Sequence, residues 1–283
     1  MKGYEVFLVE LRPLFQFLLK NSIQEKHIDQ IQRKLDSIPF FTSLILKSRI
    51  SSFQRVTINK RLFQGKNVRI DDISFLKNPP ANLVSRLGRA NLQQQSVLYA
   101  TFDPLTALSE MRPEVGDLVT TSTWKLKTDH DLTFSPVFKN STKDGIVHNE
   151  MALKASLHYA KELRNHDEET AKQIDILIKF MADCFSKDVD PNNHFDYFMS
   201  AYFANKIFYN FENGEVDAIL YPSVRQSLTL TNISIKPLIF EHNYQIDLVE
   251  EGIVTNVPSM IGGWTFNGTG YCKDFDGNKI TWR

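Results

Sequence analysis

The chain has 283 residues, and its 33 lysine and arginine residues balance 33 aspartate and glutamate residues, so its formal net charge is zero. Proteins that bind duplex DNA or anionic membranes usually carry a basic excess, and the composition argues against both classes. Cys184 and Cys272 are far apart in sequence and fit neither a disulfide framework nor a zinc site. We therefore expect a soluble protein of the cytoplasm, a reducing compartment.

The N-terminal residues have a helical pattern from about residue 4 to residue 46. Ile28, Ile31, Leu35 and Ile38 recur at helical spacing and form one apolar stripe, which Pro39 ends. Charged residues interrupt the apolar stretch at residues 1–22, so neither a signal peptide nor a membrane-spanning helix is predicted. We expect residues 1–48 to form a helical extension that precedes a domain at residues 49–283.

The stretch from residue 88 to residue 113 is predicted to form a strand followed by a helix. Residues 53–58 before it also have a strand pattern, and residues 96–102 alternate in the way that strands do. Asp103 can cap the next helix, Pro104 suits its first turn and Pro113 ends it. Glu110 should therefore lie near the end of a helix that begins where the strand carrying Tyr99 stops.

The remaining elements predict an α+β fold. Residues 118–126 are expected to form a strand, and residues from about 145 to 211 a helical block inside the domain. Strands return from residue 216, with one or two more at residues 235–249, and Asp276-Gly277 is a hairpin signal. The order of helices, strands, helices and strands favours a mixed, mostly antiparallel sheet. No metal-binding or phosphate-loop motif is present.

Three segments in order resemble the RES-domain family, the toxins of RES/Xre-type toxin–antitoxin systems. They are GRAN at residues 88–91, LYA followed by TALSE with eleven residues from Tyr99 to Glu110, and AILYPS, which ends at Ser223. A helix with the sequence YFMSAYFANKIF precedes the last segment. The resemblance extends from about residue 50 to about residue 245. It leaves the N-terminal extension outside and does not account for the helices between about residues 145 and 190.

The resemblance implies a fold related to ADP-ribosyltransferases and an activity that consumes NAD. Family members release nicotinamide by hydrolysis or phosphorolysis, and some transfer ADP-ribose to a protein. An antitoxin with a helix-turn-helix DNA-binding part neutralises them. The expected partners are thus NAD, inorganic phosphate and an antitoxin, without direct DNA or membrane binding by this chain. NAD is the substrate, and no further cofactor or metal is expected. A non-catalytic nucleotide- or partner-binding module is the alternative from a different class.

The resemblance also assigns roles to the residues that could do the catalytic work. Glu110 would stabilise the oxocarbenium-like ribose of the transition state, as a carboxylate does in glycoside hydrolysis. Arg55 would hold the pyrophosphate, with Arg61 and Arg69 as alternatives close in sequence. Ser223 would orient the substrate by a hydrogen bond. The structural alternatives are a surface carboxylate, an edge-strand arginine and a turn serine.

Four further residues are predicted to bind NAD. Arg89 is a second cation for the pyrophosphate, and Tyr99 would stack on nicotinamide or ribose. Asn91 either orients Arg89 or forms a turn. Tyr221 lies in the same buried strand end as Ser223. A core tyrosine is the alternative role for Tyr99.

Overall fold

The structure is a computed structural model, which describes residues 13, 16–38, 41–139, 141–142, 145–146, 148–190, 192–258 and 263–283. The chain forms two compact units, each assembled from three segments. Unit 1 comprises Met1–Lys47, Pro80–Ser96 and Thr133–Thr231, and unit 2 comprises Ser48–Pro79, Val97–Leu132 and Asn232–Arg283. The chain first passes from unit 1 to unit 2 at residue 48, and it returns to unit 1 twice within the predicted domain at residues 49–283.

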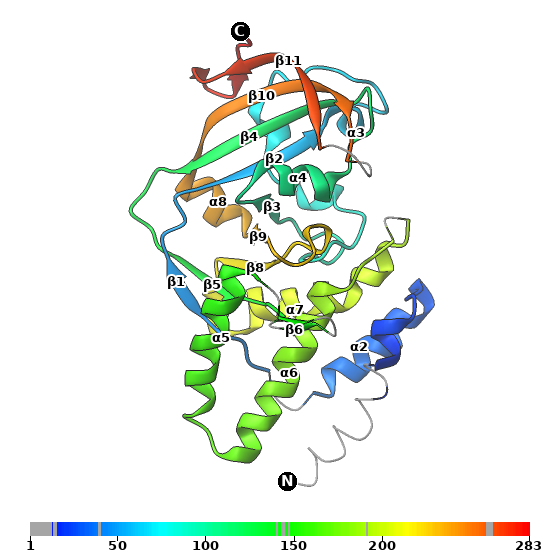
Figure 1. The fold of residues 1–283 in the computed structure, drawn as a ribbon, viewed down its shortest axis with the longest axis vertical. Helices are drawn as coiled ribbons and strands as arrows, with labels where there is room; N and C mark the ends of the chain where they lie inside the picture. Colours follow the sequence, from blue (N-terminus) through cyan, green and yellow to red (C-terminus); the bar gives the residue numbers. More distant parts are fainter. Residues whose placement is uncertain are drawn as a thin grey trace. The chain divides into compact units, whose positions relative to one another are not determined.

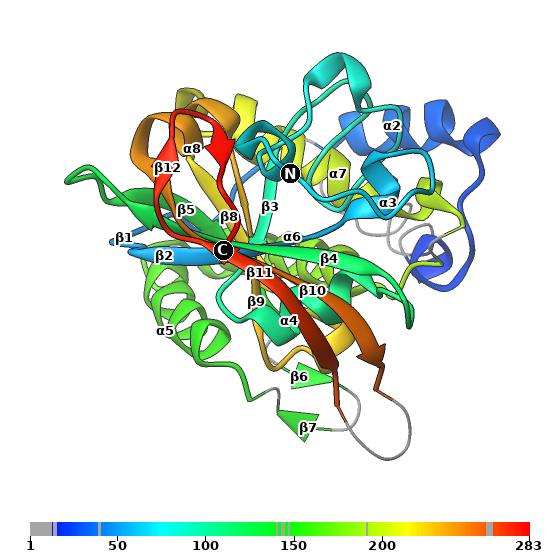
Figure 2. The ribbon, with the colours of Figure 1, turned by 90° about the horizontal axis from the view of Figure 1, so that it is seen from above.

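Unit 2 is built on an antiparallel sheet. Its strands follow the order β9 (Thr231–Ile235), β3 (Leu98–Thr101), β2 (Ser52–Ile58), β4 (Leu118–Leu126), β10 (Tyr244–Asn256) and β11 (Thr265–Cys272). Figure 2 shows β4, β10 and β11 side by side, as their pairing requires. The predicted strands at residues 53–58, 96–102 and 118–126 are thus confirmed.

The predicted strand-to-helix segment is confirmed as β3 followed by α4 (Pro104–Met111). The Asp103 side chain accepts hydrogen bonds from the backbone N–H and the hydroxyl of Thr106, and Pro104 occupies the first turn. The helix ends at Arg112, which has the left-handed φ of 50°. Ala107 and Leu108 pack against Val56 and Ile58 of the sheet. The cap at the start of α4 and the packing of its apolar face therefore both favour a helix at these residues.

The other elements of unit 2 include one that the sequence reading missed. The helix α8 (Pro237–Asn243) separates β9 from β10, where we expected only strands between residues 235 and 249. Pro237 at its first turn was the signal for a helix start. The predicted hairpin is confirmed as β12 (Phe275–Asp276) and β13 (Lys279–Ile280). The remaining helices of unit 2 are α3 (Asn59–Leu62) and η2 (Ile73–Leu76).

Unit 1 contains the predicted helical block. Its helices are α2 (Ile28–Asp36), α5 (Glu150–Leu163), α6 (Glu168–Ser186) and α7 (Phe198–Asn205), drawn in Figure 1. Short helices are η1 (Glu25–His27), η3 (Ala81–Leu83), η4 (His194–Tyr197), η5 (Lys206–Asn210), η6 (Glu212–Gly214) and η7 (Val224–Gln226). Ile31 and Leu35 of the predicted stripe are buried, whereas Pro39 and residues 1–12 lie outside the described residues.

The strands of unit 1 give the fold its parallel component. They are β1 (Leu46–Ser48), β5 (Leu132–Pro136) and β8 (Ala218–Pro222), with β6 (Ser141–Thr142) and β7 (Gly145–Ile146) as a small separate pair. β5 and β8 pair in parallel. The helical prediction up to residue 46 was too long, because residues 41–45 are irregular and β1 follows. The α+β class with a mixed, mostly antiparallel sheet is confirmed. Among the described residues, no helix has the length and apolar character needed to cross a membrane.

The core of unit 1 surrounds α7, all but one of whose residues are buried. The Phe203 ring packs edge-on against Phe180, with centroids 5.6 Å apart. Just before α7, the Nδ1 atom of His194 accepts a hydrogen bond from the backbone N–H of Leu87 at 3.2 Å. Burial, and then the nearby charge of Arg86, lower the pKa of His194. A neutral imidazole thus holds the 80–96 segment against η4.

We predict that unit 1 loses stability as the pH falls below about 6.5, the usual pKa of histidine. The folded pKa of His194 lies below the unfolded value, so the unfolded chain binds the proton first and the proton favours unfolding. Urea unfolding at about pH 7.5 and about pH 5.5 measures this effect. His194→Gln keeps an acceptor without titrating and should show a smaller pH dependence. Equal pH dependence of both proteins would contradict the assignment.

Candidate functional site

In unit 2, the candidate catalytic carboxylate is held by an asparagine on the sheet. Glu110 lies in the last turn of α4 and is half-buried, and its Oε1 atom accepts a hydrogen bond from Asn232 Nδ2 at 2.9 Å. Asn232 lies on β9 and is only 4% exposed. Its Oδ1 atom is buried and has no hydrogen-bond partner among the described residues. The carboxylate is therefore anchored to a buried residue of the sheet.

The strand register places a polar row beside this carboxylate. Thr101 of β3 pairs with Asn232 of β9 and with Gln54 of β2, and Tyr99 pairs with Ser234. Directly paired residues of antiparallel strands share a face, so these five side chains lie on one face. Along β2, Gln54 shares a face with Val56 and Ile58, because successive side chains of a strand point to opposite faces. The polar row therefore lies on the face of the sheet where Val56 and Ile58 contact α4. The face is therefore apolar under α4 and polar towards β9, where Thr101, Asn232 and Ser234 are buried.

Arg55 projects from the opposite face of the sheet. It is adjacent to Gln54 in β2 and pairs with Ser122 of β4. Its Nη1 atom donates to the carbonyl oxygen of Tyr99 at 2.9 Å, and its buried Nε atom has no hydrogen-bond partner among the described residues. Burial lowers the pKa of Arg55 to about 10, against a smaller raising effect of Tyr99. The register therefore does not bring the Arg55 and Glu110 side chains onto one face.

The two alternative arginines have structural contacts in unit 2. Arg61 donates to the carbonyl of Met111 at 2.8 Å, at the C-terminus of α4, where a cation is favoured. Arg69 donates to Glu251 Oε1 and to the carbonyl of Thr269, both at 2.8 Å, and its guanidinium lies 5.0 Å from the Trp282 ring centroid. Of the three arginines, Arg55 is the one with a buried nitrogen that lacks a partner among the described residues.

Arg89 and Asn91 belong to unit 1 and make local contacts there. Arg89 donates to the carbonyl oxygens of Phe185 at 2.7 Å and Lys187 at 3.2 Å, and its guanidinium lies 5.1 Å from the Tyr197 ring centroid. These carbonyls mark the C-terminus of α6, so the arginine caps this helix. The Asn91 amide donates to the carbonyl oxygens of Arg86 and Leu92. This geometry agrees with the turn alternative for Asn91.

Tyr221 and Ser223 also belong to unit 1, at the end of β8. Tyr221 is 4% exposed, and its ring packs 5.6 Å from the ring of Phe185. Ser223 is fully buried, its N–H donates to the carbonyl of Leu230, and its carbonyl accepts from the N–H of Leu228. Arg55, Tyr99 and Glu110 belong to unit 2. That all seven predicted residues contribute to one site stays a prediction.

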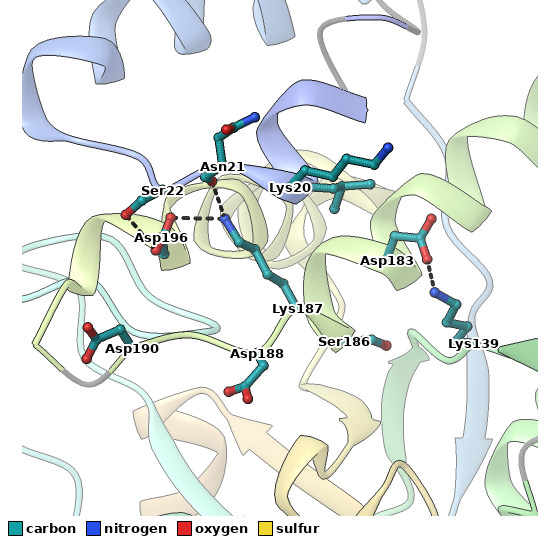
Figure 3. A pocket seen from close by; sticks show the side chains of 11 residues that line it. Lys20, Asn21, Ser22, Lys139, Asp183, Ser186, Lys187, Asp188, Asp190 and Asp196 are labelled. Carbon is teal, nitrogen blue, oxygen red and sulfur yellow. Dashed lines mark hydrogen bonds and ion pairs between the residues drawn. The ribbon is translucent and has the colours of Figure 1, made fainter. Parts of the chain in front are cut away.

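A cavity of about 650 Å³ in unit 1 is lined by lysine and aspartate side chains. Figure 3 shows the Lys187 side chain directed towards Asp196 and Asn21. Its Nζ atom donates to Asp196 Oδ1 at 2.9 Å and to the carbonyl oxygens of Leu18 and Asn21. Lys139 likewise pairs with Asp183 at 2.5 Å. Because these charges hold the N-terminal segment and α6 in place, we assign the cavity a structural role.

Asn232 is the site residue that the sequence reading missed. It follows Glu110 by 122 positions, and no local motif joins the two. The signal was the alternation of residues 231–235, TNISI, in which Asn232 and Ser234 occupy one face and two isoleucines the other. Pairing with β3 then decides which face meets α4. The pairing of β9 with β3 could not be predicted from the sequence alone.

Neither a scan against protein-family models nor a search of curated proteins finds a match to this chain. Within the described ranges, no group of three or more histidine, cysteine, aspartate or glutamate side chains is arranged to hold a metal ion. The functional argument therefore depends on the carboxylate, the polar sheet face and the three resembling segments.

We predict effects of different size on stability for two arginine substitutions in unit 2. Arg55→Met should change the free energy of unfolding by less than about 1 kcal/mol, because the gain from removing a buried cation offsets one lost hydrogen bond. Arg69→Met should cost about 2 kcal/mol or more, because it leaves the Glu251 carboxylate, 1% exposed, without its cation. Urea unfolding measures both values. A large loss for Arg55→Met would instead assign Arg55 to the structural framework.

Proposed function

We propose that the chain is an NAD-degrading enzyme that cleaves the N-glycosidic bond between nicotinamide and ribose. The observation that carries the proposal is the Glu110 carboxylate, held at 2.9 Å by buried Asn232 on a polar sheet face that also bears Tyr99. The second support is the order of the three segments that resemble the RES-domain family, which include Tyr99, Glu110 and Ser223.

The chemistry needs a negative charge beside the sugar. As the glycosidic bond breaks, its electron pair leaves with nicotinamide and the ribose carbon becomes oxocarbenium-like. A carboxylate fixed in place stabilises that positive charge without having to reorganise. The oxygen of water or of inorganic phosphate then bonds to the same carbon. Water gives ADP-ribose and a proton, whereas phosphate gives a phosphorylated ADP-ribose.

The other residues take roles in binding the substrate in this proposal. Tyr99 stacks on nicotinamide or ribose from the same sheet face as Asn232. The Nε atom of Arg55, which has no partner among the described residues, supplies a donor for a pyrophosphate oxygen, although its face of the sheet differs from that of Glu110. Arg89, Asn91, Tyr221 and Ser223 follow from the resemblance alone, and their contacts within unit 1 account for them structurally.

The proposal extends to a biological role. An enzyme that depletes NAD in its own cytoplasm is harmful, so we assign it as a bacterial toxin restrained by a helix-turn-helix antitoxin. Production of the active enzyme alone should arrest growth, and Glu110→Gln should restore it. Normal growth with an enzyme that is active on NAD would contradict the toxin role but leave the chemistry intact.

We predict that Glu110→Gln lowers the rate of nicotinamide release from NAD at least about 100-fold, because it removes the charge that faces the ribose. The measurement is free nicotinamide after incubation of purified protein with NAD, with and without phosphate. Glu114→Gln is the matched control, since the Glu114 side chain is 80% exposed and pairs with Lys60. Its rate should stay within about twofold of the wild type.

The same assay separates the other activities. A requirement for phosphate identifies phosphorolysis, and labelled ADP-ribose on a protein identifies transfer to a protein side chain. No release at high enzyme concentration would leave a non-catalytic nucleotide- or partner-binding module. Full activity of Glu110→Gln would remove Glu110 from the mechanism.

A further inference from the structure

Asn232 occupies a position where stability alone favours an apolar residue. Asn232 is 4% exposed, and the three residues that follow it on β9, Ile233, Ser234 and Ile235, are all 0% exposed. A buried acceptor without a hydrogen-bond partner costs about 1–3 kcal/mol, and Asn232 Oδ1 has none among the described residues. Such unsatisfied groups in folded proteins call for an explanation, and a catalytic role is one of those known.

Glu110, in turn, lies where a carboxylate is poorly held by its own helix. α4 has eight residues, and Glu110 is the last but one, near the negative end of the helix dipole. A glutamate side chain has several rotatable bonds, and ordering it costs conformational entropy. The hydrogen bond from Asn232 Nδ2, at 2.9 Å, offsets part of this cost.

The strand that carries Asn232 is firmly placed. β9 pairs with β3 at four consecutive positions, from Leu98 with Ile235 to Thr101 with Asn232. The pairing with β3 therefore fixes the backbone position from which the Asn232 side chain extends. A side chain held in this way can define the position of Glu110 to within the tolerance that catalysis needs.

We propose that Asn232 is a positioning residue, which holds the Glu110 carboxylate in the orientation that meets the developing charge on the ribose. This role rests on the proposed function. Asn232 acts through Glu110, so its loss should lower kcat while KM changes little. A misplaced catalytic group costs up to about 100-fold in rate, and we expect a loss of about 10- to 100-fold.

The test compares kcat, KM and the midpoint of urea unfolding for three variants. Asn232→Leu has a similar volume without a donor, so kcat should fall while stability is retained or rises. Asn67→Leu is the control, because Asn67 Nδ2 donates to the Gly116 carbonyl and its Oδ1 accepts from Leu118 N–H within the same unit. Both ends of that amide are used structurally, so this variant should lose stability and keep kcat.

Asn232→Asp covers the case in which Asn232→Leu does not fold. It keeps the shape of asparagine but replaces the donor with a carboxylate oxygen that repels Glu110, so kcat should again fall. The proposal is overturned if either folded variant of Asn232 keeps kcat within about twofold of an active wild type, and the NAD-degrading function then stands. A wild type that releases no nicotinamide overturns the proposed function itself, and this role with it.

Discussion

The packing of α4 on the sheet of unit 2 is the constraint on which the candidate site depends. Ala107 and Leu108 contact Val56 and Ile58, and this burial fixes the rotation of the helix. Once the rotation is fixed, Glu110 faces β9. The cap at Asp103 sets where the helix starts, and therefore how far along the sheet Glu110 reaches. The position of the Glu110 carboxylate therefore depends on how α4 packs on the sheet.

The elements that could be predicted from the sequence are those with strong local signals. Asp103, Pro104 and the apolar positions after them specify α4, and the Thr-, Val- and Trp-rich composition of residues 118–126 specifies β4. The Asp276-Gly277 turn specifies the final hairpin, with Gly277 at a φ of 57°. The fold class follows because these local signals occur in the order that an α+β domain requires.

The site could be predicted only in part, because its geometry depends on pairing between distant segments. Glu110 has a local signal, whereas Asn232 meets it through the β3–β9 register. The arginines show the same limit. Arg55, Arg61 and Arg69 lie close together in sequence, but only the structure shows that Arg69 meets Glu251 and that Arg61 meets the end of α4. Alternation along β2 shows that Arg55 leaves the sheet on the other side.

The division of each unit into three segments has a consequence for how the protein is made. The ribosome delivers the chain from the N-terminus, and unit 2 lacks β9, β10 and β11 until its last segment, Asn232–Arg283, emerges. Contacts between distant residues also form slowly because long loops must close first. Glu110 therefore meets Asn232 only after more than a hundred further residues have been synthesised. A nascent chain that stalls before residue 232 lacks the assembled carboxylate site, so the proposed activity requires synthesis of the segment that carries Asn232.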